Sequence, residues 1–557
     1  MSPLFFSLVL VVIMTVAASG QSFQVQCPTS TITHPNAANN NSEPDYAGPT
    51  SFSQGSKGYL EPSANVNGAI KCQQISGGDG FATMGDGSQT YLFAFGPLSG
   101  LKDMAEGKPG TQFPDVFNTW TSSLVPGDPA FSNGLTASPA SPAAWPSFPL
   151  STSALAFNGA VGLAPDADAI ASGLCTAPCL DGHVDTRQIM DVGVMNGNIP
   201  APLMAIDEDD EFFLTLTNVG QVMRPDLFEQ HTVHFHGYPN ASAFYDGVPD
   251  ASVAINIGGS FTYYYLAPDA GTYFWHCHIT PPEHLQMGMV GQIYVRPRQN
   301  RVPSGGSLRD ALMAQQGDLR TKCDRSDILC SNPVPATNSA VRGMDKLGAS
   351  QKYAYNDGDG TTAYDVEYPL QIHGFDPNFH FVGMTFNPEG FTDMKDKYFL
   401  LNGRSYPDTV TPGPLATQTT DGLMHFSQPL PSIINIPFGG KALLRIADLD
   451  VTEYQTLASL GIPMTVVGYN AKLLRDQAGN NLYYKTNSIT LAGGESLDVI
   501  LDASDTTKFP AKSVFYLYTP NLDHLSNDAE NFGGLMTEVH ICGSVTGGNT
   551  FGNQCAN

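Results

Sequence analysis

The sequence predicts an all-β fold made of two β-sandwich domains. Its 557 residues exceed the usual size of a single domain. The 56 glycines and 41 prolines, with 31 phenylalanines and 22 tyrosines, favour short strands joined by many turns. Only 14% of the residues are charged, which excludes a coiled coil and a disordered polyelectrolyte.

The N-terminus has the pattern of an export signal. Residues 4–18 are apolar apart from Ser7 and Thr15, and small residues follow at 18–20. We therefore predict a cleaved signal peptide over 1–20, a secreted protein, and no membrane partner after cleavage. The lack of Lys or Arg before the apolar run leaves a short membrane anchor as the alternative. Export would make Asn40 and Asn240 candidate glycan acceptors.

The expected strands fall into two blocks separated by turn-rich segments. After a polar segment over 21–75, the first domain covers 76–298 and carries a Pro-, Ser- and Gly-rich surface insertion at about 97–184. A linker over 299–365, a second domain over 366–545 and a tail over 546–557 complete the chain. The expected strands are 91–95, 213–217, 261–265, 271–275 and 291–295 in the first domain, and 433–436, 442–446, 464–467, 497–501 and 514–518 in the second.

Charge narrows the range of partners. The net charge of -26 repels phosphate backbones, so we expect no nucleic-acid partner. The acidic run at 207–211 is predicted to be a solvated loop, with attraction of metal-ion donors as the alternative.

The nine cysteines include one that differs from the rest. An odd count in an exported protein leaves one thiol unpaired, and Cys277 stands between two histidines in an expected strand. The others lie in polar loops suited to disulfides. Sequence does not fix their connectivity, but three close pairs are candidates: Cys175 with Cys179, Cys323 with Cys330, and Cys542 with Cys555.

Six of the thirteen histidines lie between positions 231 and 284. Side chains alternate between the faces of a strand, so histidines two residues apart share a face. His231 stands three residues before His234, and Cys277 stands between His276 and His278. Each therefore points to the face opposite to these neighbouring histidines. The two expected groups are His231 with Cys277 on one face, and His234, His236, His276 and His278 on the other.

The first group predicts a copper site. Two imidazoles, one thiolate and a weak axial thioether are the ligands of a blue-copper electron-transfer centre. We assign these roles to His231, His284, Cys277 and Met289. Zinc is disfavoured because it has no redox use for a thioether. A merely histidine-rich core is disfavoured because every buried imidazole needs a partner.

These residues resemble the copper motifs of the multicopper oxidases, a cupredoxin family that includes laccases, ferroxidases and the related copper nitrite reductases. The matching motifs are His231-x-x-His234-x-His236-Gly237 and His276-Cys277-His278, followed by His284 and Met289. The second domain is similar to a copper-free cupredoxin domain through residues 401–404, 464–469 and 494–499. The resemblance implies a type 1 copper at His231, Cys277, His284 and Met289, and a type 2/type 3 centre at His234, His236, His276 and His278. It further implies a small-molecule or metal-ion reductant, and dioxygen as the acceptor.

Two features depart from the family pattern. His284 stands seven residues after Cys277 instead of five, although Met289 keeps the usual spacing of five after His284 and is preferred to Met287 for that reason. A complete trinuclear centre needs eight histidines in four pairs, and this chain offers two pairs. The isolated histidines of the second domain are expected to be hydrogen-bonded or exposed rather than ligands: His373, His380, His425, His524 and His540.

Three functions therefore stay open. The first is an oxidase whose second copper site is completed in a homo-oligomer. The second is a trimer that resembles nitrite reductases, with a type 2 copper between subunits, although His234 and His278 replace residues usual in that group. The third is a copper-binding electron carrier without oxidase activity. A purely structural protein is the least favoured alternative, because it would leave the copper ligands unused.

Overall fold

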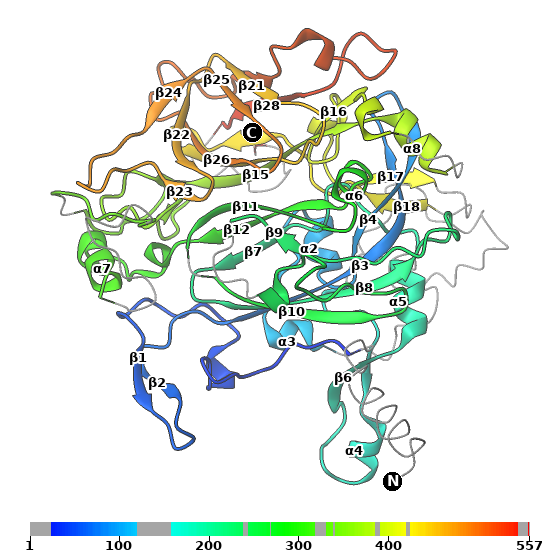
Figure 1. The fold of residues 1–557 in the computed structure, drawn as a ribbon. Coiled ribbons are helices and arrows are strands. Elements are labelled where there is room, and N and C mark those ends of the chain that lie inside the picture. The colour runs from blue at the N-terminus through cyan, green and yellow to red at the C-terminus, as the bar shows by residue number, and fades with distance from the viewer. Residues whose placement is uncertain are drawn as a thin grey trace.

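The computed structural model describes residues 24–119, 157–237, 243–267, 269–317, 330–337, 340–384, 390–418, 424–543 and 555. Strands dominate these residues and form two sandwich blocks, which confirms the all-β prediction. In Figure 1 the strands of the second block, yellow to red, lie above those of the first, blue to green.

The first block is a sandwich of two four-stranded sheets. One sheet has the order β10 (Ser260–Leu266), β8 (Glu211–Gly220), β3 (Ile70–Thr83) and β4 (Gln89–Pro97). The other has the order β7 (Met204–Asp207), β12 (Val290–Arg296), β11 (Gly271–His276) and β9 (His234–Phe235). Phe95 and Leu214 from the first sheet share one buried core with Trp275 and Ile293 from the second.

The second block repeats this plan with larger sheets. Its first sheet has the order β16 (Tyr398–Leu401), β15 (Val366–Phe375), β20 (Lys441–Asp448), β26 (Ser496–Asp502), β22 (Met464–Tyr469) and β23 (Lys472–Leu473), with β24 (Tyr484–Thr486) also paired to β22. Its second sheet has the order β19 (Ile434–Ile436), β28 (Met536–Ile541), β27 (Val514–Tyr518), β21 (Gln455–Leu460) and β25 (Ser488–Leu491). All ten strands expected from the sequence are present.

Short hairpins and helices lie around the sandwiches. The hairpins are β1 (Ser51–Gln54) with β2 (Leu60–Ala64), β5 (Leu163–Pro165) with β6 (Leu180–Val184), β13 (Lys352–Tyr353) with β14 (Ala363–Tyr364), and β17 (Leu415–Gln418) with β18 (Met424–Ser427). The α-helices are α2 (Leu101–Ala105), α3 (Pro114–Phe117), α4 (Ala167–Ala171), α5 (Thr186–Gly193), α6 (Pro281–Gln286), α7 (Leu308–Gln315) and α8 (Pro377–Met384). Among the described residues, every helix is too short or too polar to span a membrane.

Two expectations need correction: the end of the polar N-terminal segment at residue 75, and the surface position of the insertion at 97–184. Strand β3 begins at Ile70, inside the segment expected to be polar, and runs parallel to β8 in the core sheet. Its glycines resemble a loop in sequence, but they allow close approach: a Cβ on Gly80 would meet the backbone of residue 197. The insertion is also partly buried, since Leu98 and Leu101 pack against Ile189. Its residues 120–156 lie outside the described part of the chain.

The described residues of the segment at 299–365 are packed against the fold rather than forming a free linker. Its residues Tyr353, Tyr355 and Tyr364 are buried.

The acidic run at 207–211 is also buried, which contradicts the prediction of a solvated loop. Arg298 makes two hydrogen bonds to the Asp209 carboxylate, at 2.5 and 2.8 Å. Buried carboxylates need such partners, and the chain supplies them from arginines distant in sequence.

The predictions of one free cysteine and of two close disulfide pairs are confirmed, but Cys72 lies buried in strand β3 and not in a polar loop. Cys277 is free and buried. Disulfides join Cys175 to Cys179, Cys542 to Cys555, and Cys27 to Cys72. Cys330 is disulfide-bonded, but Cys323 lies outside the described residues, as do the expected signal peptide, Asn240 and nearly all of the 546–557 tail.

Asn40 is not a glycan acceptor in this fold. Its side chain is 2% exposed and its amide donates to the carbonyl oxygens of Thr29 and His34. Both N–H groups are therefore used inside the protein.

Candidate metal centres

Strand β11 presents two different faces. Tyr273, Trp275 and the following Cys277 belong to the core of the first block. Phe274 instead packs against Leu449 of the second block. The Thr272 hydroxyl, on the same face as Phe274, donates to Asp498 at 2.7 Å. The alternation of a strand thus sends the sulfur of Cys277 inward and the ring of His276 toward the second block.

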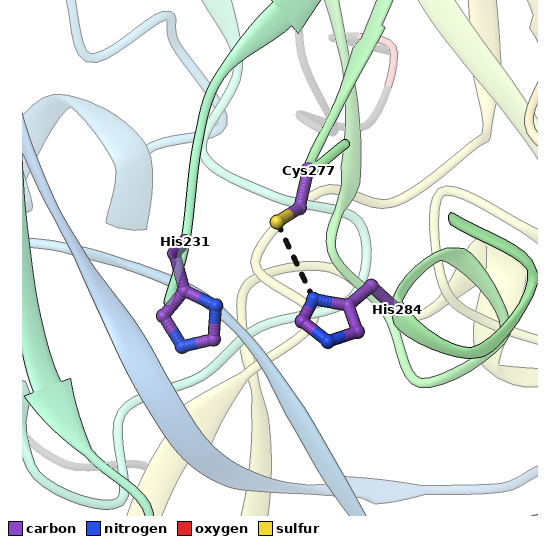
Figure 2. Close-up of side chains that lie close together, drawn as sticks. All are labelled: His231, Cys277 and His284. Carbon is purple, nitrogen blue, oxygen red and sulfur yellow. Dashed lines mark hydrogen bonds between the residues drawn. The ribbon is translucent and has the colours of Figure 1, made fainter. Parts of the chain in front are cut away.

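The first cluster gathers His231, Cys277 and His284. Their ligand atoms lie within 4.8 Å of one another, and all three side chains are buried. Figure 2 shows both imidazoles beside the Cys277 sulfur, with the His284 Nδ1 atom 3.3 Å from it. The backbone N–H of Thr232 also donates to this sulfur, at 3.4 Å. The structure brings together three of the residues expected at a blue-copper centre.

The polar atoms of this cluster fit a metal ion. Within the described residues, neither ring nitrogen of His231 has a hydrogen-bond partner at normal distance, and neither does Nε2 of His284. Burial lowers the pKa of His231 to about 3 and that of His284 well below its usual value, so both rings are neutral. Burial raises the pKa of Cys277 to about 11. Buried imidazoles without partners are costly, and a soft cation that displaces the thiol proton would satisfy all three groups.

Helix α6 explains the unusual spacing between Cys277 and His284. Pro281 and Pro282 occupy its first turn, where proline is tolerated because its missing N–H has no helical acceptor. The two extra residues therefore form a helical turn that returns the His284 ring to the sulfur. The Met289 N–H donates to the His284 carbonyl at 2.8 Å, and its carbonyl accepts from the Cys277 N–H at 3.1 Å. Both Met287 and Met289 are buried, and this backbone position supports Met289 as the axial ligand.

The second cluster gathers His234, His236 and His276, whose ligand atoms also lie within 4.8 Å of one another. His234 and His276 are direct partners in the pairing of β9 with β11. The Nε2 atoms of His236 and His276 are 2.9 Å apart. The His278 ring lies beside them, 5.1 Å from that of His234 and 5.5 Å from that of His276. His278 is not part of the converging set.

Backbone carbonyls orient two of these rings. Nδ1 of His234 lies 2.7 Å from the Asp246 oxygen, and Nδ1 of His276 lies 2.6 Å from the Cys277 oxygen. A neutral imidazole that donates through Nδ1 has its lone pair on Nε2. Burial lowers the pKa of His236 to about 4 and that of His276 to about 3, which keeps these rings neutral. The Nε2 lone pairs of His234 and His276 are thus available to one ion, and Nε2 of His236 lies beside them.

A cavity of about 410 Å³ opens beside His236 between the two blocks. The first block contributes Phe274 and residues of α6 to its wall. The second block contributes residues 450–454 and 492–494. Among the lining residues, His236 is the only one with an imidazole. A small molecule in the cavity would therefore meet the second cluster through this ring.

The structure also tests the isolated histidines. His373 donates to the Leu285 carbonyl at 3.1 Å, and the ring nitrogens of His380 lie 2.6 and 3.0 Å from two carbonyl oxygens. The ring of His524 stacks on Phe399 at 3.7 Å. His540 pairs with Glu538 at 2.6 Å. Each of these four makes a hydrogen bond or ion pair, as predicted, although Nδ1 of His373 has no partner among the described residues. The side chain of His425 lies outside the described set.

Sequence reasoning missed three contacts with the clusters. A Cβ on Gly77 would lie 2.7 Å from the His231 ring, and one on Gly494 would lie 2.9 Å from Nδ1 of His236. The Glu229 carboxylate is 3.9 Å from Nε2 of His284. The sequence indicates that these glycines lie in a strand or a turn, but only tertiary packing shows which histidine ring each one contacts.

Comparisons with known proteins agree with this chemistry. Residues 181–300 match the multicopper oxidase family model. Laccase abr2 of Aspergillus fumigatus is 34% identical over 109 residues, which cover 19% of this chain and 17% of that laccase. A copper-containing nitrite reductase of Rhizobium meliloti is 33% identical over 117 residues, covering 20% of this chain and 28% of the reductase.

A longer match is weaker. Putative laccase-17 of Oryza sativa is 23% identical over 303 residues, or 50% of this chain and 49% of that laccase. The matched segments thus span less than two thirds of these relatives. Among solved structures, the blue copper oxidase of Nitrosomonas europaea has a TM-score of 0.40 and 20% identity, and the alignment covers 62% of this chain and 78% of the oxidase.

The β-sandwich fold and the donor set of the first block are those expected of a cupredoxin-like copper site. More particularly, residues 181–300 match the multicopper oxidase family model, and this segment is similar to segments of laccases.

Proposed function

We propose that this protein is a copper-dependent oxidoreductase that takes electrons from a reductant and delivers them to dioxygen. One observation carries the proposal: a single residue, Cys277, is a member of the first cluster and contacts the second. Its sulfur lies 3.3 Å from His284, and its carbonyl oxygen lies 2.6 Å from Nδ1 of His276. The two metal positions would therefore be joined by one residue and one hydrogen bond.

The residues that would hold copper follow from the two clusters. His231, Cys277 and His284, with Met289 as axial ligand, would hold a type 1 copper. His234, His236, His276 and His278 would form the second centre. Copper bound at these positions supplies one-electron redox chemistry and a coordination position for a small oxidant.

The protein contributes orientation and a dry environment. The carbonyls of Asp246 and Cys277 hold His234 and His276 in the tautomer that offers Nε2, which is the usual role of partners behind metal-binding histidines. His231 and His284 are 0% exposed, so water is excluded from the first centre. A fixed ligand geometry in both oxidation states lowers the reorganisation needed for electron transfer.

The environment proposed for the protein is extracellular. Disulfides such as Cys27–Cys72 and Cys542–Cys555 persist in oxidising compartments. The reductant would be a small molecule or a metal ion that meets the surface near His284, where Glu229 provides a carboxylate 3.9 Å from the ring. Nitrite is the second candidate acceptor, because a nitrite reductase matches the copper-binding segment at 33% identity.

Oxygen uptake by the copper-loaded protein tests the proposal. We expect uptake with a phenol, ferrous or cuprous donor, and its loss in Cys277→Ser. His540→Ala serves as the control because His540 pairs with Glu538 away from both clusters. Uptake that survives in Cys277→Ser contradicts the proposal. Nitrite consumption without oxygen uptake favours the second candidate, and a fully loaded protein that uses neither acceptor is an electron carrier.

A further inference from the structure

We infer that the second centre is a site for a single copper ion, complete within one chain, and not half of a trinuclear cluster shared between copies. The inference rests on the proposed function, because it concerns the copper content of the same second centre. It differs from the arrangement that the family resemblance implies, and three features of the structure carry it.

The first feature is the convergence of three imidazoles from one block. The ligand atoms of His234, His236 and His276 all lie within 4.8 Å of one another. His234 and His276 each engage a carbonyl through Nδ1, so each offers Nε2. The Nε2 atoms of His236 and His276 are 2.9 Å apart, a separation that two ligands of one ion can adopt after a small movement. Three nitrogen ligands are sufficient for a metal site with an open position.

The second feature is the number of histidines that remain to serve as further copper ligands. Two of the thirteen belong to the first centre and four to the second, which leaves seven. Of these, four are at most 3% exposed and are bonded inside the fold: His34, His373, His380 and His524. Outside its own second centre, a neighbouring copy could offer only the other three, His183, His425 and His540.

These three cannot form the missing half. That half requires four imidazoles in two closely spaced pairs, whereas the three stand at isolated positions in the sequence. His183 already pairs with Asp181, and His540 pairs with Glu538. A second copy of this chain therefore cannot complete a trinuclear cluster while its own second centre keeps its histidines.

The third feature is the part of the cavity wall that the second block contributes beside His236. Residues 450–454 of the same chain line the cavity there and supply the carboxylates of Asp450 and Glu453. Asp450 is already bonded, since it accepts from Gln455 at 2.6 Å and from Thr452 at 2.8 Å. The cavity thus leaves an open side at His236 for a small ligand and presents no further imidazole from its wall.

The copper content of the protein at known mass tests the inference. The copper-loaded protein would be separated by size, and copper, chain concentration and the integrated EPR signal of the oxidised sample would be measured in each fraction. We expect two copper ions per chain in the monomer fraction, all of them visible by EPR. Antiferromagnetically coupled copper, which EPR does not detect, or a second copper found only in oligomers would overturn the inference.

A pair of variants locates the second ion. His236→Ala should reduce the copper content from two per chain to one while the blue band of the first centre persists. His540→Ala, the matched control, should leave both ions in place. If one copper per chain is bound in the unmodified protein and the blue band is present, the inference fails while the first centre stands. If the blue band is absent, the proposed function itself fails.

Discussion

Replacing Gly494 with alanine should damage the second centre and spare the first. Gly494 has a φ of +89°, and a Cβ there would lie 2.9 Å from Nδ1 and 3.1 Å from Cε1 of His236. Ordinary contact begins at 3.4 Å, so the ring must move by about 0.5 Å. The cavity beside His236 gives it a direction in which to move. This movement takes Nε2 away from its position near His276.

The size of the effect can be worked out from two terms. Alanine in a left-handed conformation costs about 1–2 kcal/mol of folding free energy. Displacing an oriented ligand typically lowers metal affinity by about 10- to 100-fold, which corresponds to roughly 1.4–2.7 kcal/mol. We therefore expect a folded protein with a second-centre copper affinity reduced by about 10- to 100-fold.

Gly77→Ala is the matched variant for the first centre. Its Cβ would lie 2.7 Å from Cδ2 of His231, a ring that is 0% exposed. The assay is a copper titration against a competing chelator, followed by the blue band and by the EPR signal of the second centre. Gly494→Ala should weaken only the second signal, and Gly77→Ala only the blue band. The reasoning is refuted if either variant weakens both signals equally, or neither.

Other changes test other parts of the account. Cys277→Ser should abolish the blue charge-transfer band in absorption spectra, and a surviving band would remove the sulfur from the ligand set. His276→Ala should keep the blue band but stop oxygen uptake, and loss of both would contradict the separation of the faces. Burial alone would raise the pKa of Glu211, but hydrogen bonds from His34, Thr31 and Thr33 lower it to about 2. This folded-state carboxylate then contributes roughly 3 kcal/mol above pH 4.5, and that contribution is lost as the pH falls toward 2. Glu211→Gln should therefore lower the urea-unfolding free energy at pH 7, with a smaller difference at pH 3, and equal differences at both pH values would refute this reasoning.

The strands and the two clusters could be predicted because they depend on local periodicity. Alternation along β11 places Cys277 opposite His276 whatever the rest of the chain does. The strand expected at 514–518 coincides with β27 because its aromatic and β-branched residues are bounded by turns.

The features that sequence could not give depend on distant partners. Strand β3 looked like a loop because its glycines create room for other segments, as Gly77 does for His231. The acidic run at 207–211 looked solvated because Arg298 and Arg301, its cationic partners, lie about ninety residues later in the chain. The cavity beside His236 required the second block to be placed over the first.

Anomalous diffraction at the copper edge from crystals of the copper-loaded protein tests the central claim most directly. The account predicts one peak bonded to the Cys277 sulfur and the rings of His231 and His284. It predicts a second, separate peak at Nε2 of His234, His236 and His276. A map without a peak at the sulfur, or with a copper bound to the sulfur but to neither imidazole, would contradict the account.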